Sequence, residues 1–233
     1  IMEPMNTTFP QEGFLQQVKE LAHRYGALLA FDETITGFRF SLGGAQSCFG
    51  VTPDLATFGK GLANGYPLSA IVGRSDVMRF MEDIFFSGTF AGETLSLAAA
   101  NAVLDKLVQE DIPNQLLMKG ETIIAGVREC IERNDVADIF GITGHPSWSF
   151  LTIAGAGKYT AWEVKTLFLQ EIFKRGILTI GAHCVSFSHS DQDIEKLLNA
   201  YDEVLPLVGN VVGENRLIEA LCCEPLEPLF KVR

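Results

Sequence analysis

The strongest indication of fold in this sequence is the run ALLAFDE at residues 27–33. It is short and continuously apolar, and it ends in two acidic residues, which is typical of a strand buried on both faces of a parallel sheet. Residues 11–25 carry apolar side chains at helical spacing, and Gly26 follows where a helix C-cap is expected. A helix that leads into a buried strand is half of a βαβ unit, so we expect an α/β fold.

Further elements are predicted on both sides of a change in character near residue 110. Apolar runs at 54–58 and 68–72 predict more strands of a mixed, largely parallel sheet, and a helix rich in small residues is expected over 93–109. Beyond the boundary we expect helices over 111–133, 161–175 and 190–205, and strands over 139–143, 149–153, 177–180 and 185–188. This order predicts a separate α+β domain over 111–205. Residues 206–233 show no clear period and are expected to form a loose tail.

Composition narrows the class of protein. The 233 residues include 47% apolar and 20% charged side chains, which is ordinary for a packed globular chain. The formal net charge of −11 opposes binding to phosphate backbones, so we expect no nucleic-acid partner. No uncharged run approaches the length of about 18 apolar residues that a membrane span needs. Five cysteines without regular spacing fit reduced thiols, so a cytoplasmic location without a membrane partner is expected.

Asp32 and Lys60 are the residues that most directly indicate chemistry. Each follows an apolar run that is predicted to be a strand. Ligands of open α/β sheets bind outside the carboxyl ends of the strands, so charged side chains from two strands meet there. In the alternative interpretation, Asp32 caps the following turn and Lys60 is a surface residue in a glycine loop.

Two kinds of ligand compete for this pair. An apolar run followed by an acid resembles the magnesium-binding strand of P-loop ATPases. The phosphate loop of those proteins needs Ser or Thr after its lysine and a glycine six residues before it, whereas here Gly61 follows Lys60 and Asp54 stands at the glycine position. Pyridoxal phosphate is the other candidate, because it needs a lysine amine and an acid that keeps its ring nitrogen protonated. Gly59 and Gly61 would let the backbone beside Lys60 approach such a cofactor closely.

Several motifs identify a family. The segments FDETITGFR at 31–39 and PDLATFGKG at 53–61 resemble class III pyridoxal-phosphate-dependent aminotransferases, and most closely the branch that contains glutamate-1-semialdehyde aminomutase. Glu3-Pro4, SGTF at 87–90 and FSHSDQDI at 187–194 resemble further segments of that family in the same order. The resemblance implies the fold of type I pyridoxal-phosphate-dependent transferases, with residues 1–110 forming part of the large domain and 111–205 the small domain.

The resemblance also implies a role for each matching residue. Lys60 would form the Schiff base with pyridoxal 5′-phosphate and carry protons during catalysis, and Asp32 would pair with the pyridinium nitrogen. Thr89 would hydrogen-bond the cofactor phosphate of the partner subunit in a homodimer whose site lies at the interface, and Gly88 would permit that close approach. The implied reaction moves an amino group from a small-molecule donor to a carbonyl acceptor.

The resemblance also has limits. The family's phosphate-binding turn and ring-stacking aromatic residue lie upstream of Glu3-Pro4, so the chain is interpreted as the C-terminal part of a longer enzyme. We expect the 233-residue chain by itself to bind the cofactor weakly and not to transaminate. Aminomutase-type members carry a Glu in the stretch that here reads GAHC at 181–184, so a general aminotransferase is favoured over an aminomutase. A catalytically silent fragment is the third alternative.

The remaining candidates are weaker. His183, Cys184 and His189 match no usual zinc spacing, so they are interpreted as packed strand residues and no metal site is predicted. Arg39 either contacts a substrate carboxylate or closes the loop after the first strand. Cys222-Cys223 is interpreted as inert or as an oxidation liability.

Overall fold

The structure is a computed structural model that describes residues 1–228, and the chain separates into two compact units. The first unit is Ile1–Leu117 and the second begins at Met118. The division falls inside helix α5 (Ile112–Arg133). The last five residues of the expected tail lie outside the described part of the chain.

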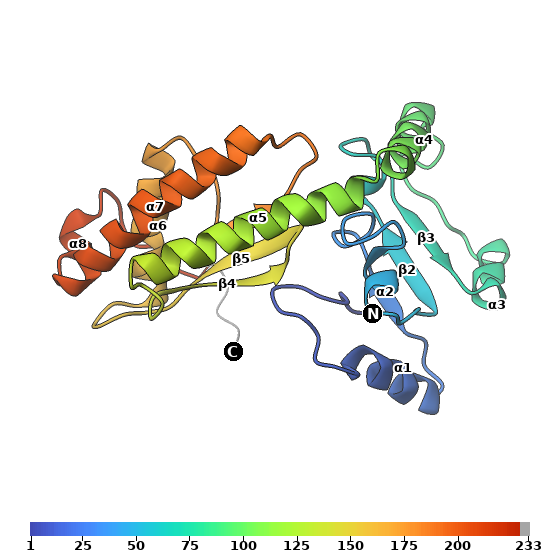
Figure 1. Ribbon diagram of the computed structural model, residues 1–233. Coiled ribbons are helices and arrows are strands. Elements are labelled where there is room, and N and C mark those ends of the chain that lie inside the picture. The colour runs from blue at the N-terminus through green and yellow to red at the C-terminus, as the bar shows by residue number, and fades with distance from the viewer. Residues whose placement is uncertain (229–233) are drawn as a thin grey trace. The chain divides into compact units, whose positions relative to one another are not determined.

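A small mixed sheet forms the centre of the first unit. Strand β1 (Ala30–Asp32) pairs in parallel with β2 (Leu55–Phe58), and β2 pairs antiparallel with β3 (Ala70–Gly73), as Figure 1 shows in blue to cyan. The expected mixed sheet is therefore confirmed, with one parallel and one antiparallel pairing. The helical elements of this unit are α1 (Phe14–Arg24), α2 (Gly44–Cys48), η1 (Lys60–Leu62), α3 (Ser75–Met78), η2 (Arg79–Glu82) and α4 (Thr94–Gln109).

Apolar side chains from α1 and the strands pack against one another in this unit. Leu15 of α1, Leu29 and Phe31 form one buried cluster, and Leu62 with Ala100 of α4 belongs to a second. Burying each such side chain contributes on the order of 1.5–3 kcal/mol. Strands β1 and β2 pair in a register that places Asp32 opposite Thr57.

One buried carboxylate joins three segments of the first unit. Asp54 accepts hydrogen bonds from His23 Nε2, from the backbone N–H of Leu29 and from an Arg74 guanidinium nitrogen, each at 2.8 Å. Burial acts to raise the pKa of Asp54, but these three donors outweigh it and hold that pKa well below its ordinary value. The carboxylate therefore stays charged and ties α1, β1 and the end of β3 to the start of β2.

The second unit is an antiparallel sheet with helices. Strands β4 (Phe140–His145), β5 (Trp148–Ile153) and β6 (Ala182–Cys184) lie in that order, and every pairing is antiparallel. Helices α6 (Ala161–Lys174), α7 (Asp191–Gly213) and the short α8 (Leu217–Ala220) lie beside one another in orange to red in Figure 1. Thr160 and Ser190 begin α6 and α7 with capping boxes, each with an acidic partner three residues later.

Two expectations for this unit are corrected. The strands expected over 177–180 and 185–188 are not formed, and β6 lies between them because the segment pairs with Trp148–Phe150 of β5 instead. Helix α7 does not end at Leu205 but continues through Pro206 to Gly213. The buried side chains of Leu205, Val208 and Val212 explain this, because packing of a continuing apolar face outweighs one missing backbone hydrogen bond.

The described part of the expected tail is not loose. Leu217 is fully buried, and its backbone N–H donates to the Tyr159 hydroxyl. Further on, Cys222 N donates to Gln170 Oε1 at 2.6 Å and Leu226 N donates to Thr166 Oγ1 at 2.8 Å. Both acceptors belong to α6, so residues 217–226 pack along that helix.

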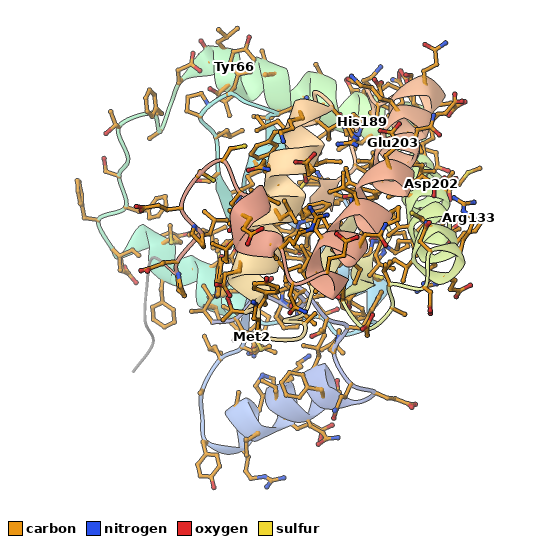
Figure 2. The ribbon with its side chains drawn as sticks, turned by 90° about the vertical axis from the view of Figure 1, so that its left-hand side faces the viewer. Met2, Tyr66, Arg133, His189, Asp202 and Glu203 are labelled. Carbon is orange, nitrogen blue, oxygen red and sulfur yellow. The ribbon has the colours of Figure 1, made fainter. Side chains whose placement is uncertain are left out.

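Several contacts hold helix α5 against its neighbours in the second unit, and an ion pair and a close approach are two of them. Arg133 at its end pairs with Asp202 of α7, and Figure 2 shows the two side chains together. Gly120 lies so close to the turn between β4 and β5 that an added Cβ would be 1.9 Å from the Pro146 carbonyl oxygen. Only glycine fits there. Within residues 1–228, no helix combines the length and the apolar character needed to cross a membrane.

Candidate functional site

The structure brings the loops that carry Asp32 and Lys60 together. Asp32 is the last residue of β1, and Lys60 follows β2 after Gly59. Because β1 and β2 are parallel neighbours, their carboxyl ends lie at the same edge of the sheet. Thr34, two residues after Asp32, lies against Gly59, with its Cγ2 atom 3.4 Å from the position that a Cβ on Gly59 would take. The half-buried carboxylate and the exposed amine therefore share one edge of the sheet.

Asp32 is held as a carboxylate by its surroundings. Its Oδ1 atom accepts a hydrogen bond from the Thr34 backbone N–H at 2.9 Å and one from Thr57 Oγ1 at 3.3 Å. The Thr34 side chain and backbone contribute most to lowering the pKa of Asp32, and Thr57 and the Lys60 ammonium add to the effect against desolvation. An ionised acid at a strand end is suited to pairing with a cationic group of a ligand.

Lys60 adopts a backbone conformation that side chains rarely adopt. Its φ angle is +38°, in the left-handed region. A strained non-glycine residue persists when the surrounding structure fixes it, and such residues cluster at functional sites. Here η1 begins at Lys60, and the backbone N–H of Asn64 donates to the Lys60 carbonyl at 2.9 Å. The local fold therefore fixes the backbone from which the amine projects.

Glu33, next to Asp32, has a structural role. It is almost fully buried, and its carboxylate accepts hydrogen bonds from the backbone N–H groups of Ala45 and Gln46, each at 2.8 Å. The Thr36 hydroxyl donates a third bond at 2.5 Å. Gly44 leaves room for this carboxylate, because a Cβ there would lie 2.6 Å from Glu33 Oε2. Glu33 thus fixes the loop after β1 against the start of α2.

The other two predicted cofactor residues belong to a different segment of the first unit. Gly88 and Thr89 are exposed residues in the segment between η2 and α4, where Ala91 N donates to the Gly88 carbonyl at 3.1 Å. No hydrogen bond joins Thr89 to Asp32 or Lys60 within residues 1–228. Their assignment to a cofactor phosphate therefore stays a prediction, and so does a substrate-binding role for Arg39 in the turn after β1.

His183, Cys184 and His189 line one pocket of the second unit, but the two histidines have different hydrogen-bond partners. His183 of β6 is buried and bonds Ser149 at 2.9 Å and the Tyr201 hydroxyl at 2.7 Å through its two ring nitrogens. Burial lowers the pKa of His183 to about 4. His189 lies just before α7 and its Nδ1 accepts from the Ser186 backbone N–H. The described residues contain no cluster of three or more metal-ligating side chains.

Sequence reasoning missed two partners of the candidate acid. Thr34 and Thr57 donate to Asp32 and keep its pKa low. The spacing of Asp32 and Thr34 offered a signal, since an aspartate often accepts from the backbone N–H two residues later. No local sequence signal indicated Thr57, because it lies beside Asp32 only through the pairing of β1 with β2.

Comparisons with known proteins point to one family. The family described as Aminotransferase class-III matches residues 1–204. A 3-aminobutyryl-CoA aminotransferase from Cloacimonas acidaminovorans is 36% identical over 208 residues, which are 87% of this chain and 49% of that protein. A glutamate-1-semialdehyde 2,1-aminomutase from Nitratidesulfovibrio vulgaris is 34% identical over 210 residues, which are 84% of this chain and 49% of that protein. The chain thus spans about half the length of these curated relatives.

Solved structures agree with the fold. An omega-transaminase from Sphaerobacter thermophilus is 26% identical with a TM-score of 0.77, and the match covers 86% of this chain and 49% of that one. A beta-phenylalanine aminotransferase from Variovorax paradoxus is also 26% identical, with a TM-score of 0.79 over 90% of this chain and 52% of that one. The expected fold, that of pyridoxal-phosphate-dependent transaminases, is therefore confirmed.

Proposed function

Because this chain belongs to the class-III aminotransferase family, we propose that it takes part in pyridoxal-phosphate-dependent amino transfer, with Lys60 and Asp32 as its cofactor residues. The observation that carries this proposal is the shared sheet edge of these two residues, where Asp32 is held ionised. The substrates are a small-molecule amino donor and a carbonyl acceptor.

The donor set at this edge fits pyridoxal phosphate. The cofactor has an aldehyde that a lysine amine can attach and a ring nitrogen that an ionised acid can keep protonated. Asp32 supplies the acid, and its own hydrogen bonds to Thr34 and Thr57 orient it. Lys60 supplies the amine from a backbone that η1 holds in place. When bound, the protonated ring acts as an electron sink for bonds at the substrate α-carbon.

The chain's own groups would then perform two tasks. The Lys60 amine would accept the proton from the substrate α-carbon and deliver it to the C4′ atom of the cofactor. Asp32 keeps its negative charge through the cycle, because its donors favour the ionised form. A fixed charge in a preorganised position stabilises the transition state without reorganisation.

Transfer between two molecules is favoured over intramolecular aminomutase chemistry. The stretch 181–184 carries no acid, and His183 within it is buried against Tyr201 and Ser149. Its side chain is therefore committed to the interior of the second unit. The 36% and 34% identities to an aminotransferase and an aminomutase do not separate the two branches, so this choice rests on the residues at 181–184.

We further propose a homodimer in which Gly88 and Thr89 serve the partner's cofactor. The segment that carries them is exposed and apolar, with Phe85 at 96% and Phe86 at 65% exposure. Large exposed aromatic residues mark surfaces that other protein covers. The Thr89 hydroxyl within such a surface would lie at the subunit contact, where it donates to a phosphate oxygen.

Reductive trapping tests the lysine assignment. The whole protein that contains this sequence is incubated with one equivalent of pyridoxal phosphate, reduced with borohydride and digested, and the labelled peptide is identified by mass spectrometry. We expect the label on Lys60, its loss in Lys60→Ala, and its retention in Lys106→Ala, which changes an exposed lysine paired with Glu110. A label that persists on another lysine in Lys60→Ala would contradict the assignment.

A further inference from the structure

Two adjacent thiols lie on the surface of the second unit. Cys222 and Cys223 are both free and exposed, and they follow Leu221, the residue that caps the end of α8. The segment that carries them is fixed along α6, because Cys222 N donates to Gln170 Oε1 and Gln170 Nε2 donates to the Ala220 carbonyl at 3.0 Å. The pair is therefore held at a defined position on this helix.

A cation lies beside the first of these thiols. Lys174 is one helical turn beyond Gln170, and its Nζ donates to Glu171 Oε1 at 2.6 Å. The hydrogen bond to Glu171 is the main cause of the raised pKa of Lys174, and attraction to the Cys222 sulfur adds to it. The thiolate is the nucleophilic form of a cysteine.

The other cysteines have less reactive surroundings. Burial raises the pKa of Cys130 to about 12, and burial together with the Glu33 carboxylate raises the pKa of Cys48. Cys184 is exposed in β6 but has no neighbouring cysteine in the sequence. Only Cys222 combines exposure, a nearby ammonium group and a second thiol in the next residue.

We propose that Cys222-Cys223 is a redox modification site that reacts with low-molecular-weight disulfides. The Cys222 thiolate attacks one sulfur of the small disulfide, so a protein–small-molecule disulfide forms and one small thiol leaves, taking up a proton. Cys223 then gives up its proton and attacks the Cys222 sulfur, which releases the second small thiol and leaves a disulfide between the two neighbours. Two protein thiols are oxidised and one small disulfide is reduced to two thiols.

The geometry makes this bond reversible. Neighbouring Cα atoms are about 3.8 Å apart across a trans peptide, whereas disulfides usually need about 4.4 Å or more. A strained disulfide is more easily reduced than a structural one. The disulfide would therefore form under oxidising conditions and be reduced to two thiols when a reductant is added.

The test measures which cysteine reacts and how fast. The reduced 233-residue chain is treated with 2-hydroxyethyl disulfide, a neutral probe that Lys174 does not attract by charge, and free thiols are trapped by alkylation before peptide mass spectrometry. We expect the Cys222-Cys223 peptide to react first and to lose the mass of two hydrogens. In Cys223→Ser the reaction should stop at the mixed disulfide on Cys222.

A cysteine control completes the test. Cys184→Ser should leave the rate at Cys222 unchanged. Reaction at Cys184 or Cys48 as fast as at Cys222, or no intramolecular disulfide in the unmodified chain, would overturn the proposal.

Discussion

His183 is kept neutral by burial, and this gives the second unit a dependence on pH. Its pKa falls from an ordinary 6.5 to about 4 because the folded chain desolvates the ring. Between these two values the unfolded chain binds a proton that the folded chain does not. Stability therefore falls as the pH drops from 6.5 towards 4, by about 3 kcal/mol in total.

Urea unfolding at a series of pH values measures this effect. The free energy of unfolding should decrease towards pH 4 in the unmodified chain, and the decrease should be smaller in His183→Gln, which keeps polar groups for Ser149 and Tyr201. His189→Gln is the control, because His189 is exposed. Parallel curves for the unmodified chain and His183→Gln between pH 6.5 and 4 would show that the ring titrates normally.

Asp32→Asn separates the proposed catalytic role from a structural one. The amide keeps the shape and can still accept from Thr34 N, but it removes the charge that the proposal assigns to the cofactor ring. We expect turnover by the whole protein that contains this sequence to fall about 1000-fold, equivalent to about 4 kcal/mol of transition-state stabilisation. The matched control is Asp105→Asn on the exposed side of α4. Near-normal turnover would leave Asp32 as a turn-capping residue only.

At the scale of single elements, helices were more predictable than strands. Helices α4, α5 and α6 lie within a residue or so of the expected bounds, because caps and apolar spacing are local signals. Strand β6 was misplaced, since its position depends on the distant partner β5. The extension of α7 past Pro206 was missed for the same reason, because the buried face of Val208 and Val212 outweighs the local effect of a proline.

Some residues of the candidate site could be located from local sequence signals and others could not. Asp32 and Lys60 could be located from sequence because each follows a short apolar run, and parallel pairing then brings the strand ends together. Thr57 could not be found, since only the register of β1 and β2 places it beside Asp32. Thr89 was selected by family resemblance alone, and its proposed contact requires a second subunit.

Helix α5 offers a test of packing between elements. Gly120→Ala places a Cβ within 1.9 Å of the Pro146 carbonyl oxygen, and backbone on both sides must move to accept it. We expect a loss of about 3 kcal/mol in the free energy of unfolding, measured from the urea midpoint. Gly213→Ala in α7 is the control, because nothing lies within 4 Å of its added Cβ. Equal stability of the two variants would mean that α5 does not contact this turn.

At the scale of the whole molecule, apolar exposure predicts self-association. The segment 80–90 exposes several large apolar side chains, namely Phe80, Ile84, Phe85, Phe86 and Phe90. We expect sedimentation velocity to show species larger than a monomer at micromolar concentration, and Phe85→Ser/Phe86→Ser to shift the chain towards the monomer. The control Phe173→Ser/Leu178→Ser changes two exposed residues of the second unit and should not shift the chain towards the monomer. A monomeric unmodified chain would remove the support for the proposed subunit contact.

Asp54 also couples the local opening of two segments of the first unit. Its side chain holds the Leu29 amide, and its carbonyl accepts the Arg74 amide at 3.0 Å, so two segments far apart in sequence depend on one residue. Neither amide can open to solvent without disturbing the other through that residue. Leu29 and Arg74 should therefore exchange deuterium as one cooperative unit, slowly and with the same opening free energy, while the exposed residues 84–87 exchange faster.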